Sequence, residues 1–175
     1  MTRATAQQLG GQNVCAFLDM LTVSEGTHGI GDDGYNVIVG GKTFNNGYAQ
    51  HPEPSIWLPR YKIYSSACGR YQFIKKTWRN LSALLHLVDF SPVAQDFAAV
   101  ELIRGRGALD DVKAGRFELA VAKCAKEWAS LPGAGYGQRE NALTALEDVY
   151  EDAGGHLVDL DKLATAYQAA GGSYA

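Results

Sequence analysis

The sequence lacks the features that would assign it to several large classes of protein. It has only three cysteines, Cys15, Cys68 and Cys124, and no two of them form a C-x-x-C pair. This spacing excludes a zinc knuckle and a thiol redox motif, so we expect small buried side chains in a protein made in a reducing compartment. No run of about 18 apolar residues occurs, so we expect no insertion into a membrane.

A large excess of charge of one sign is also missing. The 175 residues carry a formal net charge of only -3, which provides no basic footprint for nucleic acid and no polybasic patch for a membrane surface. The N-terminal residues contain no apolar signal core. The sequence therefore predicts synthesis in the cytoplasm without a signal peptide and no partnership with nucleic acid.

The residues that are present favour one mainly helical domain. Val14, Phe17, Leu18 and Leu21 recur at helical spacing, and a stop near residue 26 would place a glutamate at the C-terminal end of this helix. After it, residues 35–44 ("YNVIVGGKTF") predict a small β-hairpin. Residues 51–62 contain three prolines and predict an extended loop.

Helical patterns fill most of the remaining chain. They run onward from Gln72, from Ser91-Pro92 to about residue 103, over 116–129 and over 138–152, with a short helix in 107–115. Together these elements predict an α+β fold that is mainly helical, with one strand region between the first two long helices. We expect a flexible segment at residues 1–12, a domain at 13–155 and a C-terminal extension at 156–175 with a helical pattern.

Two glycine-rich patterns resemble nucleotide-binding motifs, but neither has the required context. Gly29, Gly31 and Gly34 spell G-x-G-x-x-G, yet a helix precedes them and a strand follows, which reverses the order that a dinucleotide site needs. The segment "GGKT" at 40–43 would need a glycine where Asn36 stands. The four histidines show no paired spacing, so the sequence predicts neither a cofactor nor a metal.

Glu25 is the residue whose position suggests chemistry. A carboxylate at the C-terminal end of a helix faces the negative end of the helix dipole, which disfavours its ionised form. Burial in a cleft would raise its pKa further and produce an acid that can protonate a leaving oxygen. A solvated surface glutamate is the alternative, and position alone does not decide between the two.

Five motifs occur along the chain in a characteristic order. They are "FLDMLTVSEGT", "GYNVIVGG", "HP" at 51–52, "CGRYQ" at 68–72 and "WASLPGAGYGQ" at 128–138. Together they resemble the phage lambda endolysin family of lysozyme-like enzymes that cleave peptidoglycan, and the likeness runs from about Val14 to Gly155. The resemblance implies a lysozyme-like fold in which a small β-hairpin region and a helical lobe flank a cleft.

The resemblance also implies a reaction. Such enzymes act as lytic transglycosylases, which break the β-1,4 bond between N-acetylmuramic acid and N-acetylglucosamine and leave a 1,6-anhydro ring. The family's acid lies in its S-E-G-T segment, which corresponds to Glu25. Attack by the sugar's own C6 hydroxyl removes the need for a positioned water, so one glutamic acid acts first as acid and then as base.

One position departs from the family pattern. The lambda protein has Asp where this chain has Asn36, which argues against a second catalytic carboxylate at this position. Asp32, Asp33 and Glu53 remain as substitutes, so a muramidase that hydrolyses the same bond stays open. A non-catalytic wall-binding protein on the same fold, and a virion-associated rather than a free enzyme, also stay open.

Residues of the other motifs are candidates for substrate binding. We place Tyr35 and Asn36 on the rim of the hairpin, and Trp57 is the candidate for stacking on a sugar. Trp78 and Trp128 fall on helical stripes and are expected in the core.

The later motifs supply the remaining candidates. Gly69 permits close approach of a sugar, and Gln72 offers an amide for an N-acetyl group or for Glu25. Arg70 pairs either with a peptidoglycan carboxylate or with the catalytic acid. Tyr136 and Gln138 are expected to line the cleft.

The resemblance further implies where the protein works. We expect it to act on peptidoglycan glycan strands in the periplasm or cell wall, as a monomer, after a membrane-permeabilising holin gives it access.

Overall fold

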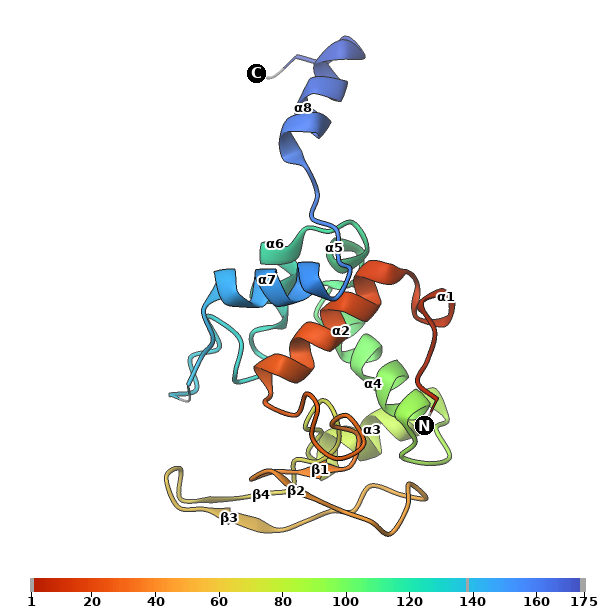
Figure 1. The fold of residues 1–175 in the computed structure, drawn as a ribbon, viewed down its shortest axis with the longest axis vertical. Helices are drawn as coiled ribbons and strands as arrows, with labels where there is room; N and C mark the ends of the chain where they lie inside the picture. The colour runs from red at the N-terminus through yellow and green to blue at the C-terminus, as the bar shows by residue number, and fades with distance from the viewer. Residues whose placement is uncertain (1, 138, 174–175) are drawn as a thin grey trace.

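The computed structural model of the chain describes residues 2–137 and 139–173, which form eight helices and four short strands (Figure 1). The fold is α+β and mainly helical, as predicted. The strands form two antiparallel hairpins, β1 (Val37–Ile38) with β2 (Lys42–Thr43) and β3 (Ile56–Leu58) with β4 (Ile63–Ser65). The helices are α1 (Ala6–Leu9), α2 (Gln12–Ser24), α3 (Lys75–Leu85), α4 (Pro92–Gly105), α5 (Leu109–Lys113), α6 (Phe117–Cys124), α7 (Leu143–Asp152) and α8 (Leu160–Ala169).

Helix α2 runs through the helical body and is enclosed by α4, α5 and α7 (Figure 1). The predicted stripe from Val14 to Leu21 is fully buried, and Ala16 and Met20, on the rest of its circumference, are buried too. A helix that buries residues beyond its predicted stripe needs neighbours on several sides, and this one has them. Its C-terminal end is therefore held firmly where the hairpin region begins.

Local signals predicted the start of one helix better than the ends of others. Ser91 caps α4, because its hydroxyl accepts a hydrogen bond from the Ala94 amide at 3.3 Å, and Pro92 opens the helix. Helix α6 ends at Cys124, earlier than the predicted 129. Trp128 beyond it is nevertheless a core residue, as expected, and its indole N–H donates to the Tyr71 carbonyl at 3.2 Å.

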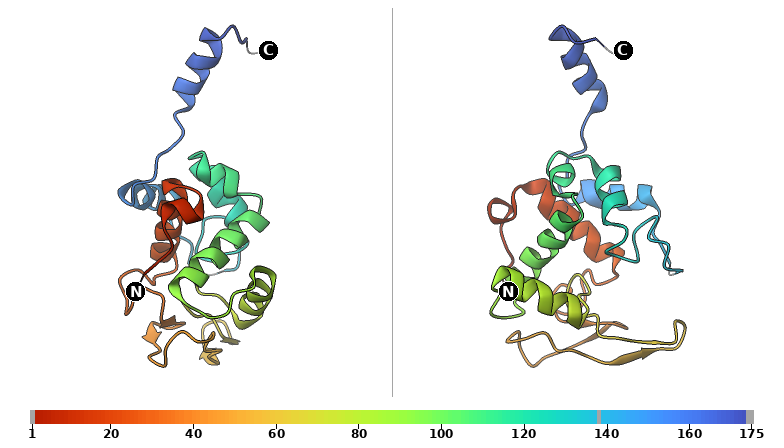
Figure 2. Two further views of the ribbon diagram at one scale, coloured as in Figure 1. Left: turned by 90° about the vertical axis from the view of Figure 1, so that its right-hand side faces the viewer. Right: turned by 180° about the vertical axis from the view of Figure 1, so that it is seen from behind.

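The predicted first hairpin is confirmed, whereas the extended loop predicted at 51–62 is wrong from residue 56 onward, where strand β3 begins. The turn of the first hairpin uses Gly40 and Gly41 at φ 90° and 82°, a conformation that glycine adopts without strain. In place of the expected loop, Trp57 pairs with Tyr64 across β3 and β4. Each of these strands has only three residues, which is too short to show alternation in the sequence. This second hairpin projects from the helical body as an arm (Figures 1 and 2).

The two ends of the described chain differ in their contacts with the helical body. Ala4 and Leu9 are buried, and the Ala4 amide donates to Asp96 at 3.0 Å, so residues expected to form a flexible segment have fixed contacts with the body. Helix α8 instead extends away from the body in all three ribbon views (Figures 1 and 2). The domain boundaries at 13 and 155 stay a prediction. Within the described ranges, no helix is both long and apolar enough to cross a membrane.

The three cysteines are free thiols. Cys68 and Cys124 are fully buried, as expected, whereas Cys15 is half-buried. Burial raises the pKa of Cys68 and of Cys124 to about 12.

Candidate active site

Glu25 lies where α2 ends, as predicted. Its backbone N–H still donates to the Leu21 carbonyl at 2.9 Å, and Gly26 then turns the chain with φ +69°. The hydroxyl of the buried Thr27 donates to the Arg70 carbonyl at 2.7 Å, which joins this turn to the "CGRYQ" segment. The S-E-G-T segment is thus a short, braced turn that presents one carboxylate.

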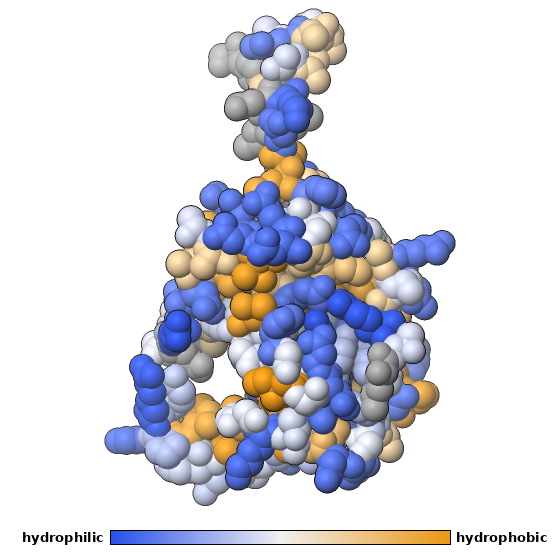
Figure 3. Space-filling model, in the orientation of Figure 1, coloured by the Kyte–Doolittle hydropathy of each residue, from blue (hydrophilic) through white to orange (hydrophobic). Residues whose placement is uncertain are grey.

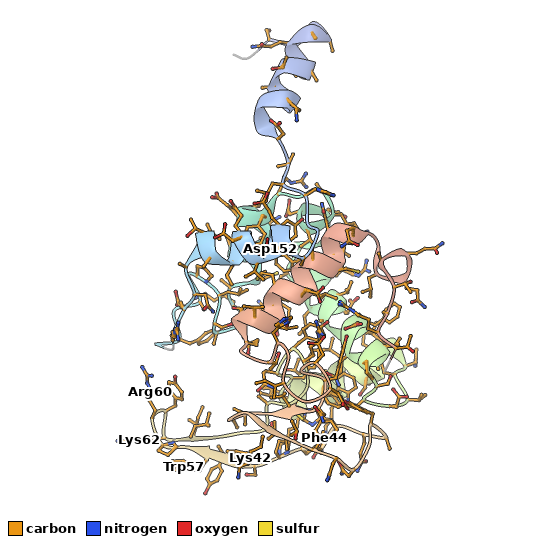
Figure 4. The ribbon with its side chains drawn as sticks, viewed as in Figure 1. Lys42, Phe44, Trp57, Arg60, Lys62 and Asp152 are labelled. Carbon is orange, nitrogen blue, oxygen red and sulfur yellow. The ribbon has the colours of Figure 1, made fainter. Side chains whose placement is uncertain are left out.

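The Glu25 side chain lines a cleft of about 430 Å³ between the helical body and the arm. Leu58 and Ile63 form the wall on the arm, Gln72 follows the second hairpin in the chain, and Trp128 lies on the side of the body. In the space-filling view the molecule is hollowed beside the arm (Figure 3). Arg60 and Lys62 lie at the tip of the arm (Figure 4). The arrangement agrees with a hairpin region and a helical lobe flanking a cleft.

The surroundings of Glu25 favour its neutral form. Burial raises the pKa of this carboxyl, and this effect outweighs the opposing hydrogen bond that the Ser130 hydroxyl donates to Oε1 at 2.5 Å. No cation pairs with Glu25 among the described residues. The site therefore has the properties of a general acid that retains its proton to higher pH than an ordinary glutamate.

Ser130 is a functional residue that the sequence argument missed. It is separated from Glu25 by 105 positions, so no local pattern could join the two. The available signal was its place inside the long "WASLPGAGYGQ" motif, where only Tyr136 and Gln138 were singled out.

Arg70 is not available to substrate, so both alternatives given for it are wrong. The side chain is 1% exposed, and one guanidinium nitrogen donates to Asp19 at 2.7 Å. The other terminal nitrogen pairs with the Asp33 carboxylate. The guanidinium also lies over the Tyr35 ring, 4.8 Å from its centroid. Arg70 therefore joins α2 to the loop before β1 and makes no ion pair with Glu25.

Tyr35 and Gly69 also face the interior, and their predicted positions are wrong. Tyr35 is 5% exposed and its hydroxyl donates to Asp96 at 2.9 Å, so it is not on the hairpin rim. Gly69 has φ +82°, and a Cβ there would lie 2.3 Å from the side-chain oxygen of Gln95. This glycine is needed for packing against Gln95 and Phe90, not for access of a sugar.

Both the oxygen and the nitrogen of the Asn36 side-chain amide form hydrogen bonds within the hairpin region. Its oxygen accepts from the Asp32 amide at 2.9 Å, and its nitrogen donates to the Phe44 carbonyl at 3.0 Å. A carboxylate could make only the first of these bonds, because it has no hydrogen to donate. The structure thus gives the amide a structural use, and contact with a sugar stays a prediction.

The remaining candidates divide between the cleft and the outer surface. Gln72 lines the cleft with Glu25, although its side-chain nitrogen donates to the Gly69 carbonyl. Trp57 is on the opposite face of the arm from Leu58 and packs on Tyr64 with ring centroids 5.0 Å apart. Tyr136 is 55% exposed. Gln138 lies outside the described residues.

The carboxylates proposed as substitutes for a second acid are all engaged elsewhere. Asp32 accepts from the Tyr48 hydroxyl at 2.9 Å, Asp33 pairs with Arg70, and Glu53 accepts from Arg79 at 2.8 Å. None of the three is among the described residues that line the cleft.

One other carboxylate does line the cleft, and it too has a partner. Glu127 accepts two hydrogen bonds from the Arg106 guanidinium, at 2.8 and 2.6 Å. Both bonds reach one oxygen, Oε2, so the Glu127 carboxylate is held in an ion pair with Arg106. Glu25 is therefore the cleft carboxylate suited to carry a proton.

Comparison with known proteins identifies the family. The profile of the family described as Endolysin matches residues 15–157. The endolysin of Escherichia phage P2 is 49% identical over 156 residues, which cover 82% of this chain and 94% of that protein. This chain belongs to the endolysin family. The endolysin of Escherichia phage lambda is 42% identical, over 83% of this chain and 94% of its own length.

Solved structures confirm the fold of this endolysin. Bacteriophage lambda lysozyme in complex with a chitohexasaccharide matches with a TM-score of 0.80 and 39% identity, over 90% of this chain and 100% of that one. A second structure of lysozyme from bacteriophage lambda matches with a TM-score of 0.77, 38% identity and the same coverage. This endolysin therefore has the lambda lysozyme fold, and it is a peptidoglycan-cleaving enzyme that lyses the cell wall.

Proposed function

We propose that this endolysin is a lytic transglycosylase that cleaves the β-1,4 bond between N-acetylmuramic acid and N-acetylglucosamine. The observation that carries the proposal is the state of Glu25, a cleft carboxyl whose pKa is raised by burial and which no described cation pairs. Such a group holds a proton that it can transfer to the glycosidic oxygen.

The reaction needs only this one carboxyl. Glu25 protonates the glycosidic oxygen as the bond from that oxygen to C1 of muramic acid breaks. The C6 hydroxyl of the same sugar then bonds to C1, and its proton returns to Glu25, which ends the cycle in its starting form. Because nucleophile and electrophile belong to one sugar, holding the ring in the right conformation supplies the effective concentration that a second carboxylate and a water supply in hydrolases.

The shape of the site supports a glycan as substrate. Lambda lysozyme, of the same fold, has been solved with a chitohexasaccharide. In this chain Gln72 and the apolar side chains of Leu58 and Ile63 line the cleft beside Glu25. We assign Gln72 as a ligand of an N-acetyl group and the apolar side chains as surfaces for sugar rings.

The nature of the released ends tests this proposal against a muramidase. Purified cell wall is digested with the protein, the fragments are treated with borohydride, and their masses are determined. Anhydro-muramic ends are not reduced, whereas the muramic ends left by hydrolysis are, so we expect fragments of unchanged mass. Reduced muramic ends would show that water is the acceptor and that the enzyme is a muramidase.

We also propose that the enzyme works as a monomer on the wall and reaches it after a holin has permeabilised the membrane. Expression alone is then expected to leave host cells intact, and permeabilising the membrane with chloroform to cause rapid lysis. Lysis by the protein alone would contradict the need for a holin.

A further inference from the structure

Three polar side chains form a hydrogen-bonded chain that ends at Glu25. The Ser130 hydroxyl lies 2.5 Å from Oε1 of Glu25, and the Ser24 hydroxyl lies 2.8 Å from that of Ser130. The side-chain nitrogen of Asn141 lies 3.1 Å from the Ser24 hydroxyl. These residues come from the end of α2, from the "WASLP" segment and from the segment before α7, so the chain joins three separate parts of the protein at the acid.

The direction of these hydrogen bonds follows from the chemistry of the groups. The Ser130 hydroxyl donates its one hydrogen to Oε1 of Glu25, so in the neutral acid the proton of the carboxyl is on Oε2. The Ser130 oxygen must then accept from Ser24, and the Ser24 oxygen in turn accepts from Asn141. Each residue in the chain is a donor to the next.

The orientation of the Asn141 amide is fixed independently. Its side-chain nitrogen also lies 3.1 Å from the Ser130 carbonyl and 3.3 Å from the Ser24 carbonyl, so its two hydrogens serve three acceptors and one hydrogen is shared between two of them. Two carbonyl oxygens accept and never donate, so the amide must present its NH₂ group to them. The backbone N–H of Asn141 donates to the same Ser130 carbonyl at 2.9 Å, which locks the residue in place.

We propose that Ser130, Ser24 and Asn141 position Glu25 through a one-way series of donors, which reserves Oε1 as an acceptor and leaves Oε2 to carry the catalytic proton. The inference rests on the proposed role of Glu25. None of the three residues needs to touch the substrate. Their function is to decide which oxygen bears the proton and to keep that oxygen turned toward the cleft.

The same chain sets how easily Glu25 ionises. Of the two causes that shift the pKa of Glu25, burial raises it and the Ser130 hydrogen bond lowers it. The other ionisable side chains of the cleft are Tyr71, Lys126 and Glu127. Lys126 donates to the Ala134 carbonyl at 2.6 Å and Glu127 pairs with an arginine, so neither is directed at the acid. Ser130 is thus the single described group that counteracts burial.

Replacement of the hydroxyl gives a direct test. In Ser130→Ala the carboxylate loses its donor while burial remains, so we expect the pKa of Glu25 to rise by about one to two units. The alkaline limb of the profile of kcat/KM against pH then moves upward by the same amount. Ser130→Thr keeps a hydroxyl and is expected to restore the original profile. Ser82→Ala, which removes a hydroxyl bonded to the Arg79 carbonyl on α3, is the matched control and leaves the profile unmoved.

A measurement without substrate separates this inference from the proposed reaction. The carboxyl carbon shift of Glu25, assigned by its loss in Glu25→Gln and followed by NMR against pH, reports the same rise in Ser130→Ala. Ser24→Ala, in which Ser130 keeps its bond to Glu25 but loses its own donor, is expected to give a smaller shift in the same direction, and it carries the test if Ser130→Ala does not fold. An unmoved pKa overturns the inference, whereas full lysis by Glu25→Gln would overturn the proposed reaction.

Discussion

Two carboxyl groups in this protein lose much of their hydration, the buried Asp96 on α4 and the half-buried Glu25 at the end of α2, but their hydrogen bonds differ. Burial raises the pKa of both. Asp96 is fully buried and accepts hydrogen bonds from the Tyr35 hydroxyl at 2.9 Å, the Tyr71 hydroxyl at 2.6 Å and the Ala4 amide at 3.0 Å. Glu25 has one donor, Ser130, and its second oxygen has no partner among the described residues.

The difference separates a structural carboxyl from a reactive one. Three donors satisfy Asp96 and join the N-terminal segment, the loop before β1 and the "CGRYQ" segment to α4. Glu25 is half-satisfied, so one oxygen remains free to exchange a proton with a substrate. A raised pKa alone does not mark a catalytic acid; a raised pKa together with an unused oxygen beside a cleft does.

The largest effect is expected from Glu25→Gln. The amide cannot donate a proton as an acid, so the rate of release of soluble wall fragments is expected to fall by about 10²–10⁴-fold. Binding of a chitooligosaccharide, measured by calorimetry, is expected to persist, because the shape of the cleft is retained. Loss of binding together with lysis would assign Glu25 a role in holding substrate instead.

The same variant is expected to be more stable than the parent protein near neutral pH. Because the pKa of Glu25 is raised in the folded state above its ordinary value of 4.5, the parent is fully stabilised only below that value and loses stability as pH rises through the folded pKa. Glu25→Gln does not titrate, so urea unfolding at several pH values is expected to show a gain that appears only above about pH 5.

Asp96→Ala is expected to have the opposite effects to Glu25→Gln. It is expected to lower the stability of the fold strongly and to change the rate of wall cleavage little. It leaves two buried hydroxyls and an amide without an acceptor, which is expected to lower the free energy of unfolding by about 3 kcal/mol. Glu101→Ala, on the same helix, removes the half-buried partner of the exposed Arg104 and is the control, with a change within about 0.5 kcal/mol. Equal losses in the two variants, measured by denaturant unfolding, would remove the distinction between the two carboxyls.

A smaller effect is expected from Asn36→Asp. This change adds a carboxylate near the hairpin and removes the side-chain N–H that donates to the Phe44 carbonyl. We expect the free energy of unfolding to fall by about 1 kcal/mol because the Phe44 carbonyl loses its hydrogen bond. Anhydro ends are expected to remain the product. An increase in reducing ends, detected by mass analysis, would show that this position can serve as a second catalytic acid.

Local sequence patterns correctly predicted the features that depend on residues close together in the chain. The stripe of α2, the Ser91 cap and the first hairpin all depend on residues within a few positions of one another, and all are confirmed. The position of Glu25 at the end of α2 belongs to the same class. The motif resemblance supplied the fold and the family, which the comparisons confirm.

Long-range pairing explains most of what the sequence did not predict. Arg70 pairs with Asp19, 51 positions away, and Tyr35 bonds to Asp96, 61 positions away, so their burial could not be read from neighbouring residues. Arg70 and Tyr35 were assigned to the substrate site because they are polar or aromatic residues of the motifs. Here they satisfy one another in the interior.

The free cysteines bear on the proposed route of this protein from the cytoplasm to the cell wall. Attack on a disulfide requires a thiolate, and with pKa values of about 12 Cys68 and Cys124 remain protonated thiols at neutral pH. The fold therefore has no covalent cross-link for glutathione to reduce and no reactive sulfur at these two positions for an oxidant to capture. On that proposed route, neither Cys68 nor Cys124 needs to change its covalent state.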